Sequence, residues 1–366
     1  MKKRTALFSV LLAALLFLGY AAAAGGNADD PLISLDYLKN VFAPSALGTI
    51  DQRLDSSDQR ISDAISASGG SAASPQSQAS GWTERRFKQG DVITGYTGTQ
   101  LLPLAGDVSV RLTAGSVVDA TDAQELSSGA ALHSNHRYLV AEDATAQFTV
   151  TSKTAVLDYR GPYEITPSTT PDYNAMASAL KALSLFRGTG SGFGEGFELE
   201  KAPTRAEALV MLIRLLGEEN AALSCTAPQP FSDVPEWVAP YVAYAYEKGY
   251  SNGVGDGKFG TTMTTSATMY VEFILRALGY SSTAQTDISD ALSRARAAGI
   301  LTAGECAQLQ STPFLRADVA YLSYYALEVP LAGSGTTLQQ KLSSAGVFTA
   351  DAYRAARALV TSARLW

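Results

Sequence analysis

The stretch Pro203-Thr204-Arg205-Ala206-Glu207, followed by ALVMLIRLLG at residues 208–217, decides the fold of the second half of the chain. Thr204 and Glu207 have the spacing of a capping box, in which each side chain accepts a hydrogen bond from the backbone of the other. Behind this cap, apolar residues recur at helical spacing, so one face should be buried. The stretch therefore predicts an amphipathic helix that begins after Thr204 and ends near Gly217.

Arg205 falls in the first turn of this helix, where the partial positive charge of the helix end favours anions over cations. Two interpretations are open. An arginine beside unpaired backbone N–H groups can form a site for a carboxylate or a phosphate. Alternatively, Arg205 is a solvated surface side chain, which is the simpler interpretation if this helix is considered alone.

The downstream sequence places the helix in a wider pattern. Phe231-Ser232-Asp233-Val234-Pro235-Glu236-Trp237 precedes a helical run, and Gly253-Val254-Gly255-Asp256-Gly257-Lys258-Phe259 precedes a second apolar helix that ends near Gly279. This order resembles the S-layer homology (SLH) repeat, with its F-x-D-V, Trp, G-x-x-x-G-x-x-D-G-x-F and TRAE elements. The resemblance covers residues 170–332, a little under half of the chain.

Three repeats are expected, at about 170–220, 228–282 and 285–332. The second has Ser266-Ala267-Thr268-Met269 in place of TRAE, and the third has Leu315-Arg316-Ala317-Asp318. The resemblance implies an all-α bundle of three repeats that binds an acidic, typically pyruvate-bearing, cell-wall polysaccharide in the grooves between repeats. The residues that it implicates in binding are Thr204, Arg205, Ala206 and Glu207 in the first repeat, Asp233 and Trp237 in the second, and Arg316 and Asp318 in the third.

The N-terminus predicts export. Lys2, Lys3 and Arg4 precede an apolar run at 6–19 and small residues at 21–24, which is the pattern of a secretory signal peptide over residues 1–24. The apolar run is short for a membrane span, which needs ~20 residues, and an uncleaved anchor is the alternative. The net charge of −7 and the lack of a later basic cluster argue against nucleic-acid binding. We expect no transmembrane anchor after cleavage.

The whole chain is predicted to be an α+β multi-domain protein. Residues 25–66 read as a polar helical segment whose Leu47, Leu54 and Ile61 recur every seven residues, as in a spacer, a weak self-association helix or a helix packed on its neighbour. Residues 67–80 are rich in Ser, Ala and Gly, as in a flexible linker. Residues 333–366 are expected to form a closing helical segment that packs against the repeats.

Residues 81–166 predict a small all-β domain. Short runs rich in Val, Thr and Tyr alternate there with turn residues, at 91–95, 108–110, 138–140, 147–150 and 156–159. The segment is also similar to a β module that accompanies SLH repeats in exported proteins, on the basis of Gly90-Asp91, Asn135-His136 and Arg160-Gly161-Pro162-Tyr163.

Other candidate chemistry is sparse. The only histidines, His133 and His136, form an H-x-x-H pair without an obvious third ligand, so ordinary imidazoles and no metal are expected. The only cysteines, Cys225 and Cys306, fit either a disulfide or two free thiols. We find no catalytic nucleophile or metal-protease motif and expect no cofactor, so the sequence predicts a protein that is not an enzyme.

Two functions fit these features better than an enzyme does. The first is an exported cell-surface protein whose SLH repeats anchor it non-covalently to an acidic secondary cell-wall polysaccharide. The second is a secreted structural protein whose degenerate repeats bind another protein. The missing Arg of the second repeat and the missing capping Thr of the third favour this alternative.

Overall fold

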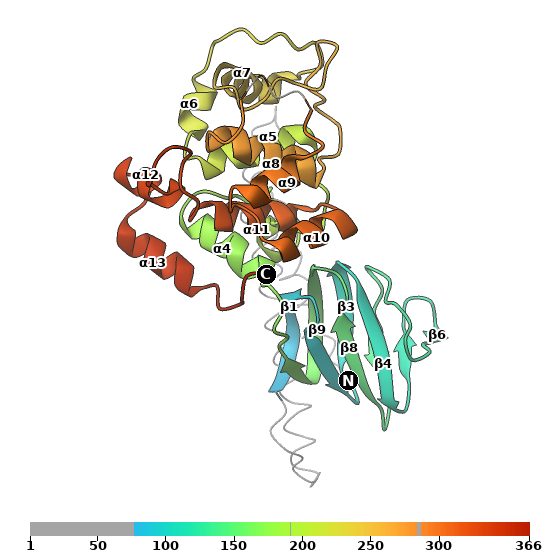
Figure 1. Ribbon diagram of the computed structural model, residues 1–366. Coiled ribbons are helices and arrows are strands. Elements are labelled where there is room, and N and C mark those ends of the chain that lie inside the picture. Colours follow the sequence, from blue (N-terminus) through green and yellow to red (C-terminus); the bar gives the residue numbers. More distant parts are fainter. Residues whose placement is uncertain (1–76, 191, 283, 285–286) are drawn as a thin grey trace, which may run out of the picture. The chain divides into compact units, whose positions relative to one another are not determined.

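The computed structural model describes residues 77–190, 192–282, 284 and 287–366. The chain divides into two units between Ala72 and Ala73, and the described residues belong to the second. The predicted signal peptide, the helical segment at 25–66 and most of the predicted linker lie outside the described residues. The second unit consists of a β domain followed by a helical domain (Figure 1). Within the described residues, no helix has the length and apolar character needed to span a membrane.

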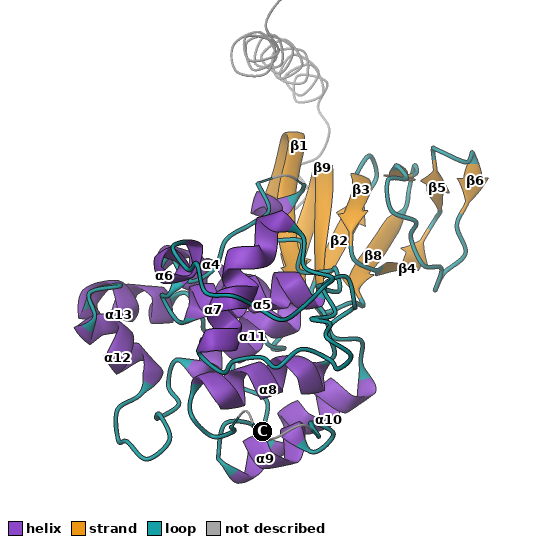
Figure 2. Cartoon of the chain, turned by 90° about the horizontal axis from the view of Figure 1, so that it is seen from above, coloured by secondary structure: helices purple, strands orange, loops and turns teal. Residues whose placement is uncertain are grey.

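The β domain is one curled antiparallel sheet in the order β4-β8-β2-β9-β3-β7-β5-β6 (Figure 2). Residues 156–159 of β9 pair with β3 on one edge and with β1 on the other. The strands are β1 (Ser77–Lys88), β2 (Val92–Tyr96), β3 (Gln100–Ala105), β4 (Val108–Ala114), β5 (Val117–Asp119), β6 (Gln124–Glu125), β7 (Tyr138–Val140), β8 (Thr145–Val150) and β9 (Thr154–Thr166).

Alternating burial explains why most of these strands form. In β2 and β8 every second residue is buried, so each strand gives one apolar face to a core that includes Ile93, Phe148 and Tyr159. All five predicted strands are confirmed. The sequence did not predict β1, β3, β5 or β6, and β1 begins at Ser77, inside the segment predicted as linker.

The helical domain has its own apolar core, to which nearly all of its helices contribute. Its helices are α4 (Tyr173–Ala182), α5 (Arg205–Leu215), α6 (Glu219–Leu223), α7 (Ala239–Glu247), α8 (Ala267–Ala277), α9 (Ala291–Ala297), α10 (Ala303–Ser311), α11 (Arg316–Ala326), α12 (Leu338–Ser344) and α13 (Ala350–Ala358). Two short 3-10 helices, η2 (Gly194–Gly196) and η3 (Glu236–Val238), lie in the connections.

The predicted capping box of α5 is confirmed. The backbone N–H of Glu207 donates to Thr204 Oγ1 at 3.3 Å, and the N–H of Thr204 donates to Glu207 Oε2 at 2.8 Å. The cap of α8 is Ser266, one of the hydroxyl residues available for that role. At α11 only half of the box remains, because Leu315 offers no side-chain acceptor while Asp318 still accepts from the Leu315 N–H at 2.8 Å.

Helix starts from different parts of the domain pair with each other. The N–H of Arg205 donates to Met263 O at 2.8 Å, so α5 begins against the segment that precedes α8. In the same way, the N–H of Arg316 donates to Lys201 O at 2.8 Å, so α11 begins against the segment that precedes α5. Met263 and Lys201 each lie three residues before the N-cap of the helix that follows them, Ser266 or Thr204, so the two contacts are equivalent.

The C-terminal segment contains helices, as predicted, and it packs on the same core. Leu338 and Leu342 of α12 are buried. After α13, Arg364 binds Glu305 of α10 with Nε–Oε1 at 2.6 Å, and Thr302 Oγ1 donates to Leu365 O at 2.6 Å. The last residues of the chain therefore brace the start of α10.

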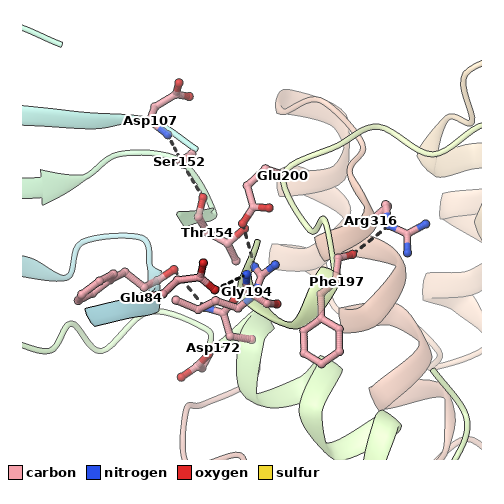
Figure 3. Close-up of polar contacts among 12 residues, drawn as sticks. Glu84, Asp107, Ser152, Thr154, Asp172, Gly194, Phe197, Glu200 and Arg316 are labelled. Carbon is pink, nitrogen blue, oxygen red and sulfur yellow. Dashed lines mark hydrogen bonds and ion pairs between the residues drawn. The ribbon is translucent and has the colours of Figure 1, made fainter. Parts of the chain in front are cut away.

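Polar contacts join the β domain to the helical domain. Lys153, in the turn between β8 and β9, places Nζ 2.6 and 2.7 Å from the two carboxylate oxygens of Asp318 on α11. Glu84 of β1 accepts from the Gly194 N–H at 2.7 Å, as Figure 3 shows. Both side chains of the Lys153–Asp318 pair are more than nine-tenths buried, so this is an ion pair of the interior.

The two cysteines are not joined. Cys306 is buried against the carbonyl of Leu292, whereas Cys225 is half-buried near Glu247. The structure thus has two free thiols, and the alternative of a disulfide is not supported.

Candidate functional site

A cavity of about 540 Å³ lies between the start of α5, the loop after α7 and helix α8. Its volume is in the range of ~300–1,000 Å³ that is typical of small-ligand pockets. We call it the Arg205 cavity. It is lined by Arg205, Tyr250, Ser251, Asn252, Gly253, Val254, Gly255, Met263, Met269, Glu272, Phe273, Arg276 and Ile288.

Arg205 is only 5% exposed, and the structure holds its guanidinium on several sides. Nε donates to Phe259 O at 2.9 Å, and Nη2 donates to Ser251 Oγ at 3.0 Å and to Gly253 O at 3.4 Å. The guanidinium carbon lies 4.7 Å from the centre of the Phe273 ring and 5.2 Å from that of Phe259. The side chain is therefore part of the packing between α5, α8 and the loop.

This arrangement corrects both expectations for Arg205. It is not a solvated surface side chain, since it is buried. It does not lie beside unpaired helix N–H groups either, because the N–H groups of Arg205, Ala206 and Glu207 donate to Met263 O, Thr261 O and Thr204 Oγ1. The donor that the cavity could offer to an anion is therefore the guanidinium and not the helix end.

One nitrogen of Arg205 is left for a ligand. Nη1 makes no hydrogen bond to any residue that the structure describes, while Nε and Nη2 are both engaged. Burial and the nearby positive charge of Arg276 lower the pKa of Arg205 to about 10, so the guanidinium stays charged at neutral pH. A charged donor without a partner at a cavity wall favours an anionic acceptor such as a carboxylate.

The other charged groups of the cavity leave an excess of positive charge. Glu272 is 3% exposed, and its oxygens accept from Arg276 Nε at 2.8 Å, Ser281 Oγ at 2.7 Å and Arg294 Nη2 at 2.7 Å. Its carboxylate is thus neutralised from within the fold. Two arginines and one glutamate line the cavity, which is consistent with an anionic ligand.

The other first-repeat candidates, Thr204, Ala206 and Glu207, do not line this cavity. Thr204 and Glu207 cap α5, and Ala206 is fully buried. Their role in the structure is to place Arg205.

Asp233 and Trp237 also lie away from the lining. Asp233 clamps the loop before α8, because its carboxylate accepts from the N–H groups of Phe259, Gly260 and Thr261 at 2.7–3.3 Å. Desolvation acts to raise the pKa of Asp233, but these donors outweigh it and lower the pKa below its ordinary value. Trp237, on η3, is 59% exposed, so its indole is open to solvent.

Arg316 repeats part of the Arg205 arrangement. It is 6% exposed, its Nε donates to Phe197 O at 3.1 Å (Figure 3), and its guanidinium carbon lies 5.9 Å from the centre of the Phe186 ring. Asp318, by contrast, is committed to Lys153 and to the Leu315 N–H. Its carboxylate is therefore held inside the protein, not presented to a sugar.

Sequence reasoning missed Ser251, Glu272 and Arg276. Glu272 and Arg276 are four residues apart on α8, a spacing that signals a helical ion pair, but nothing local indicates that the pair faces Arg205. Ser251 directly precedes the glycine-rich motif at 253–259, which is the available signal for its place beside that loop.

A larger cleft of about 950 Å³ lies between β1, α4 and residues 359–363. Its charged groups are mostly paired within the fold. Lys88 Nζ lies 2.6 Å from Asp91, and Arg86 contacts Glu200 at 3.0 Å and Gly194 O at 2.7 Å. Arg86 Nη2 is buried without a partner among the described residues, but three basic and four acidic described residues line this cleft, so the Arg205 cavity offers the stronger case for an anionic ligand.

Comparisons with known proteins concern the segment that supplies the loop beside Arg205. A family model described as the S-layer homology domain matches residues 230–266, which include Asp233, Trp237 and most of the loop beside Arg205. A "Cell surface protein" of Thermoanaerobacter kivui is 32% identical over 111 residues. That match covers 30% of this chain and 14% of the relative, so the chain corresponds to a small part of that protein. Residues 230–266 of this chain are therefore similar to an S-layer homology domain.

Proposed function

We propose that the chain is an exported cell-surface protein that its helical domain holds to the cell wall by binding an acidic secondary polysaccharide. The observation that carries the proposal is the guanidinium of Arg205, which lines a cavity with excess positive charge and whose Nη1 has no hydrogen-bond partner among the described residues. The loop beside this guanidinium lies in the segment that matches the S-layer homology domain. The name of the Thermoanaerobacter kivui relative supports a location at the cell surface.

We further propose that the helical domain consists of three SLH repeats whose main helices are α5, α8 and α11. Two observations support this. Arg205 and Arg316 both begin such a helix, and both donate Nε to the carbonyl of a phenylalanine in the loop that leads into another of these helices, Phe259 before α8 and Phe197 before α5. The backbone hydrogen bonds of the helix starts also join α5 to the segment before α8 and α11 to the segment before α5.

The ligand group that fits best is a carboxylate on a sugar, as in a pyruvate-bearing polymer. Arg205 Nη1 would donate to one carboxylate oxygen, and Arg276 adds positive charge at the same cavity. The largest single contribution should come from the Arg205 cavity, because Asp318 of the third repeat is already bound to Lys153. Exposed Trp237 would offer a stacking face for a neighbouring sugar ring.

A wall-pelleting assay tests the proposal. The mature chain is incubated with purified wall sacculi, before and after chemical removal of secondary polymers, and the bound fraction is measured. We expect binding that requires the polymer. Binding to none of the wall preparations would contradict the proposal and favour the alternative that the repeats bind another protein.

Two variants test the cavity, and thermal melting of each is measured beside wall binding, because Arg205→Lys also removes the Nε bond to Phe259 O. Arg205→Lys keeps the positive charge but loses the planar guanidinium with its several N–H donors. Met263→Trp places a larger side chain at the wall of the cavity and leaves Arg205 unchanged. Hydrogen bonds to charged groups contribute about 1.5–3 kcal/mol, so each variant should weaken wall binding by roughly 10–100-fold. Arg354→Lys, on the exposed face of α13, is the matched control and should bind as the wild type does. Full binding by a folded Met263→Trp variant would show that the cavity is not the site.

A further inference from the structure

Three metal-ligating side chains meet at the edge of the β domain, far along the chain from the Arg205 cavity. They are Asp119 at the end of β5, Asp122 in the following turn and His136 just before β7. One ligand atom from each lies within 4.8 Å of the others. His136 Nδ1 is 2.8 Å from Asp119 Oδ2 and 3.7 Å from Asp122 Oδ2.

The surrounding backbone fixes this cluster. Asp119 Oδ1 accepts from the N–H groups of Thr121 and Asp122 at 2.9 and 3.2 Å, so Oδ2 is the oxygen left to face His136. The two segments are also tied to each other. The N–H of Ala120 donates to Arg137 O at 2.7 Å, and the N–H of Arg137 donates to Thr121 Oγ1 at 2.9 Å.

Exposure differs among the three side chains in a way that suits a site reached from solvent. The side chain of Asp119 is 4% exposed, that of His136 is 23% exposed, and that of Asp122 is 52% exposed. Asp119 forms the buried floor and Asp122 the open side. The ring of His133 lies beside that of His136, with centroids 5.2 Å apart, so a second imidazole borders the cluster.

The spacing suits a small divalent ion. Zinc bonds of about 2.0–2.2 Å in tetrahedral geometry place ligand atoms roughly 3.4 Å apart. The observed 2.8 and 3.7 Å from His136 to the two aspartates bracket that separation, and all three ligand atoms lie within 4.8 Å of one another, so side-chain shifts of about 1 Å would bring them to the spacing of a zinc site. An imidazole nitrogen beside two carboxylates is a donor set for zinc and similar transition metals, whereas calcium and magnesium prefer oxygen alone.

We propose that Asp119, Asp122 and His136 bind a divalent transition-metal ion of the zinc class, with solvent completing its coordination. The ion would replace the Asp119–His136 hydrogen bond and would bring Asp122 into direct contact. The two carboxylates of Asp119 and Asp122 would balance the charge of the ion. The ligands come from the end of β5, the turn that follows it and the segment before β7. The ion would therefore link the β5–β6 turn to the segment before β7.

Zinc titration of the full chain, stripped of metal by a chelator, tests this proposal by calorimetry. We expect one zinc ion bound at this cluster. Cobalt, as a spectroscopic probe, should give the visible absorption of a low-symmetry site that zinc abolishes and that excess calcium or magnesium leaves unchanged. Equal displacement by calcium would overturn the assignment to a transition metal.

Variants decide whether the bound ion is held by these residues. Asp122→Asn and His136→Gln should each weaken zinc binding by at least about tenfold, since a direct ligand matters no less than the outer-shell partners whose loss costs ~10–100-fold. Asp122 is the more informative, because its side chain is half exposed and its substitution should not unfold the domain. Glu142→Gln, an exposed acidic residue of the same domain, is the control and should leave binding unchanged. Zinc affinity equal to the wild type in both ligand variants would refute the site.

Discussion

Replacing Lys153 by Met should reveal how firmly the β domain and the helical domain are joined. The ammonium of Lys153 lies within 2.7 Å of both oxygens of Asp318, and the two side chains are 8% and 3% exposed. Methionine keeps most of the packing volume but leaves a buried carboxylate without its counter-ion. Breaking one partner of a buried pair costs about 3–5 kcal/mol, so Lys153→Met should lower the free energy of unfolding by that amount at pH 8.

The cost should shrink at acid pH. Burial raises the pKa of Asp318 above its ordinary value of 3.8, although Lys153 acts in the opposite direction. When the pKa of a carboxyl group is higher in the folded state than in the unfolded state, the free energy of unfolding of the protein falls as the pH rises from the lower to the higher of the two values. In Lys153→Met the folded-state pKa of Asp318 should be higher still, because the neighbouring positive charge is gone. Lowering the pH should therefore protonate Asp318 and reduce the loss of unfolding free energy.

Urea unfolding, followed by circular dichroism at pH 8 and pH 5, measures both effects. The double variant Lys153→Met/Asp318→Asn removes the unpaired charge and should recover most of the loss, because Asn can still accept from the Leu315 N–H. An exposed ion pair contributes at most about 1 kcal/mol, so a smaller decrease than this in the free energy of unfolding of Lys153→Met, equal at both pH values, would indicate an exposed pair. The ion pair would then not be buried in solution, and the contact between the two domains would have to be abandoned.

Two further predictions concern the loop beside Arg205. Gly253 has φ +79°, and an added Cβ would clash with Lys258 O and the Phe231 ring, whereas Gly255 has φ +101° and open space. Gly253→Ala should therefore lower the melting temperature and wall binding more than Gly255→Ala, and equal losses in the two variants would contradict the clash. Asp233→Asn should cost roughly 2–3 kcal/mol at pH 7 through weaker bonds to the loop N–H groups. Because the folded-state pKa of Asp233 is lowered, this contribution is present above pH 3.8 and is lost as the pH falls through the folded value, so urea unfolding should show a smaller difference at pH 2 than at pH 7.

The elements that the sequence predicted are those whose signal is local. The capping box of α5 needs only Thr204 and Glu207, three residues apart, and the strands β2, β4, β7, β8 and β9 show β-rich composition next to turn residues. Strand β1 lacks such a signal, because residues 82–85 are all exposed. It forms through backbone pairing with β9, from Thr83 opposite Tyr159 to Lys88 opposite Thr154. No property of the β1 sequence alone encodes that partner.

The site was predictable only in part, for a related reason. The motif identified Arg205, but the groups that bury it, Phe259 and Ser251, come from a loop about fifty positions later. Whether an arginine in a first turn faces water or a neighbouring loop depends on how the repeats pack. The partner of Asp318 is more distant still, since Lys153 belongs to a different domain and lies 165 positions away.

The shared geometry of Arg205 and Arg316 changes how a binding experiment must be designed. Each guanidinium is almost fully buried, donates Nε to a phenylalanine carbonyl and lies near an aromatic ring, so each first joins two helical units. Truncation to alanine would leave those carbonyls without a donor, at a cost of about 1–3 kcal/mol each before any ligand is considered. A loss of wall binding in an alanine variant would thus not distinguish a missing ligand contact from a loosened junction. Met263→Trp should avoid this ambiguity, because Met263 lines the Arg205 cavity and its side chain makes none of the hydrogen bonds or ring contacts of the Arg205 side chain.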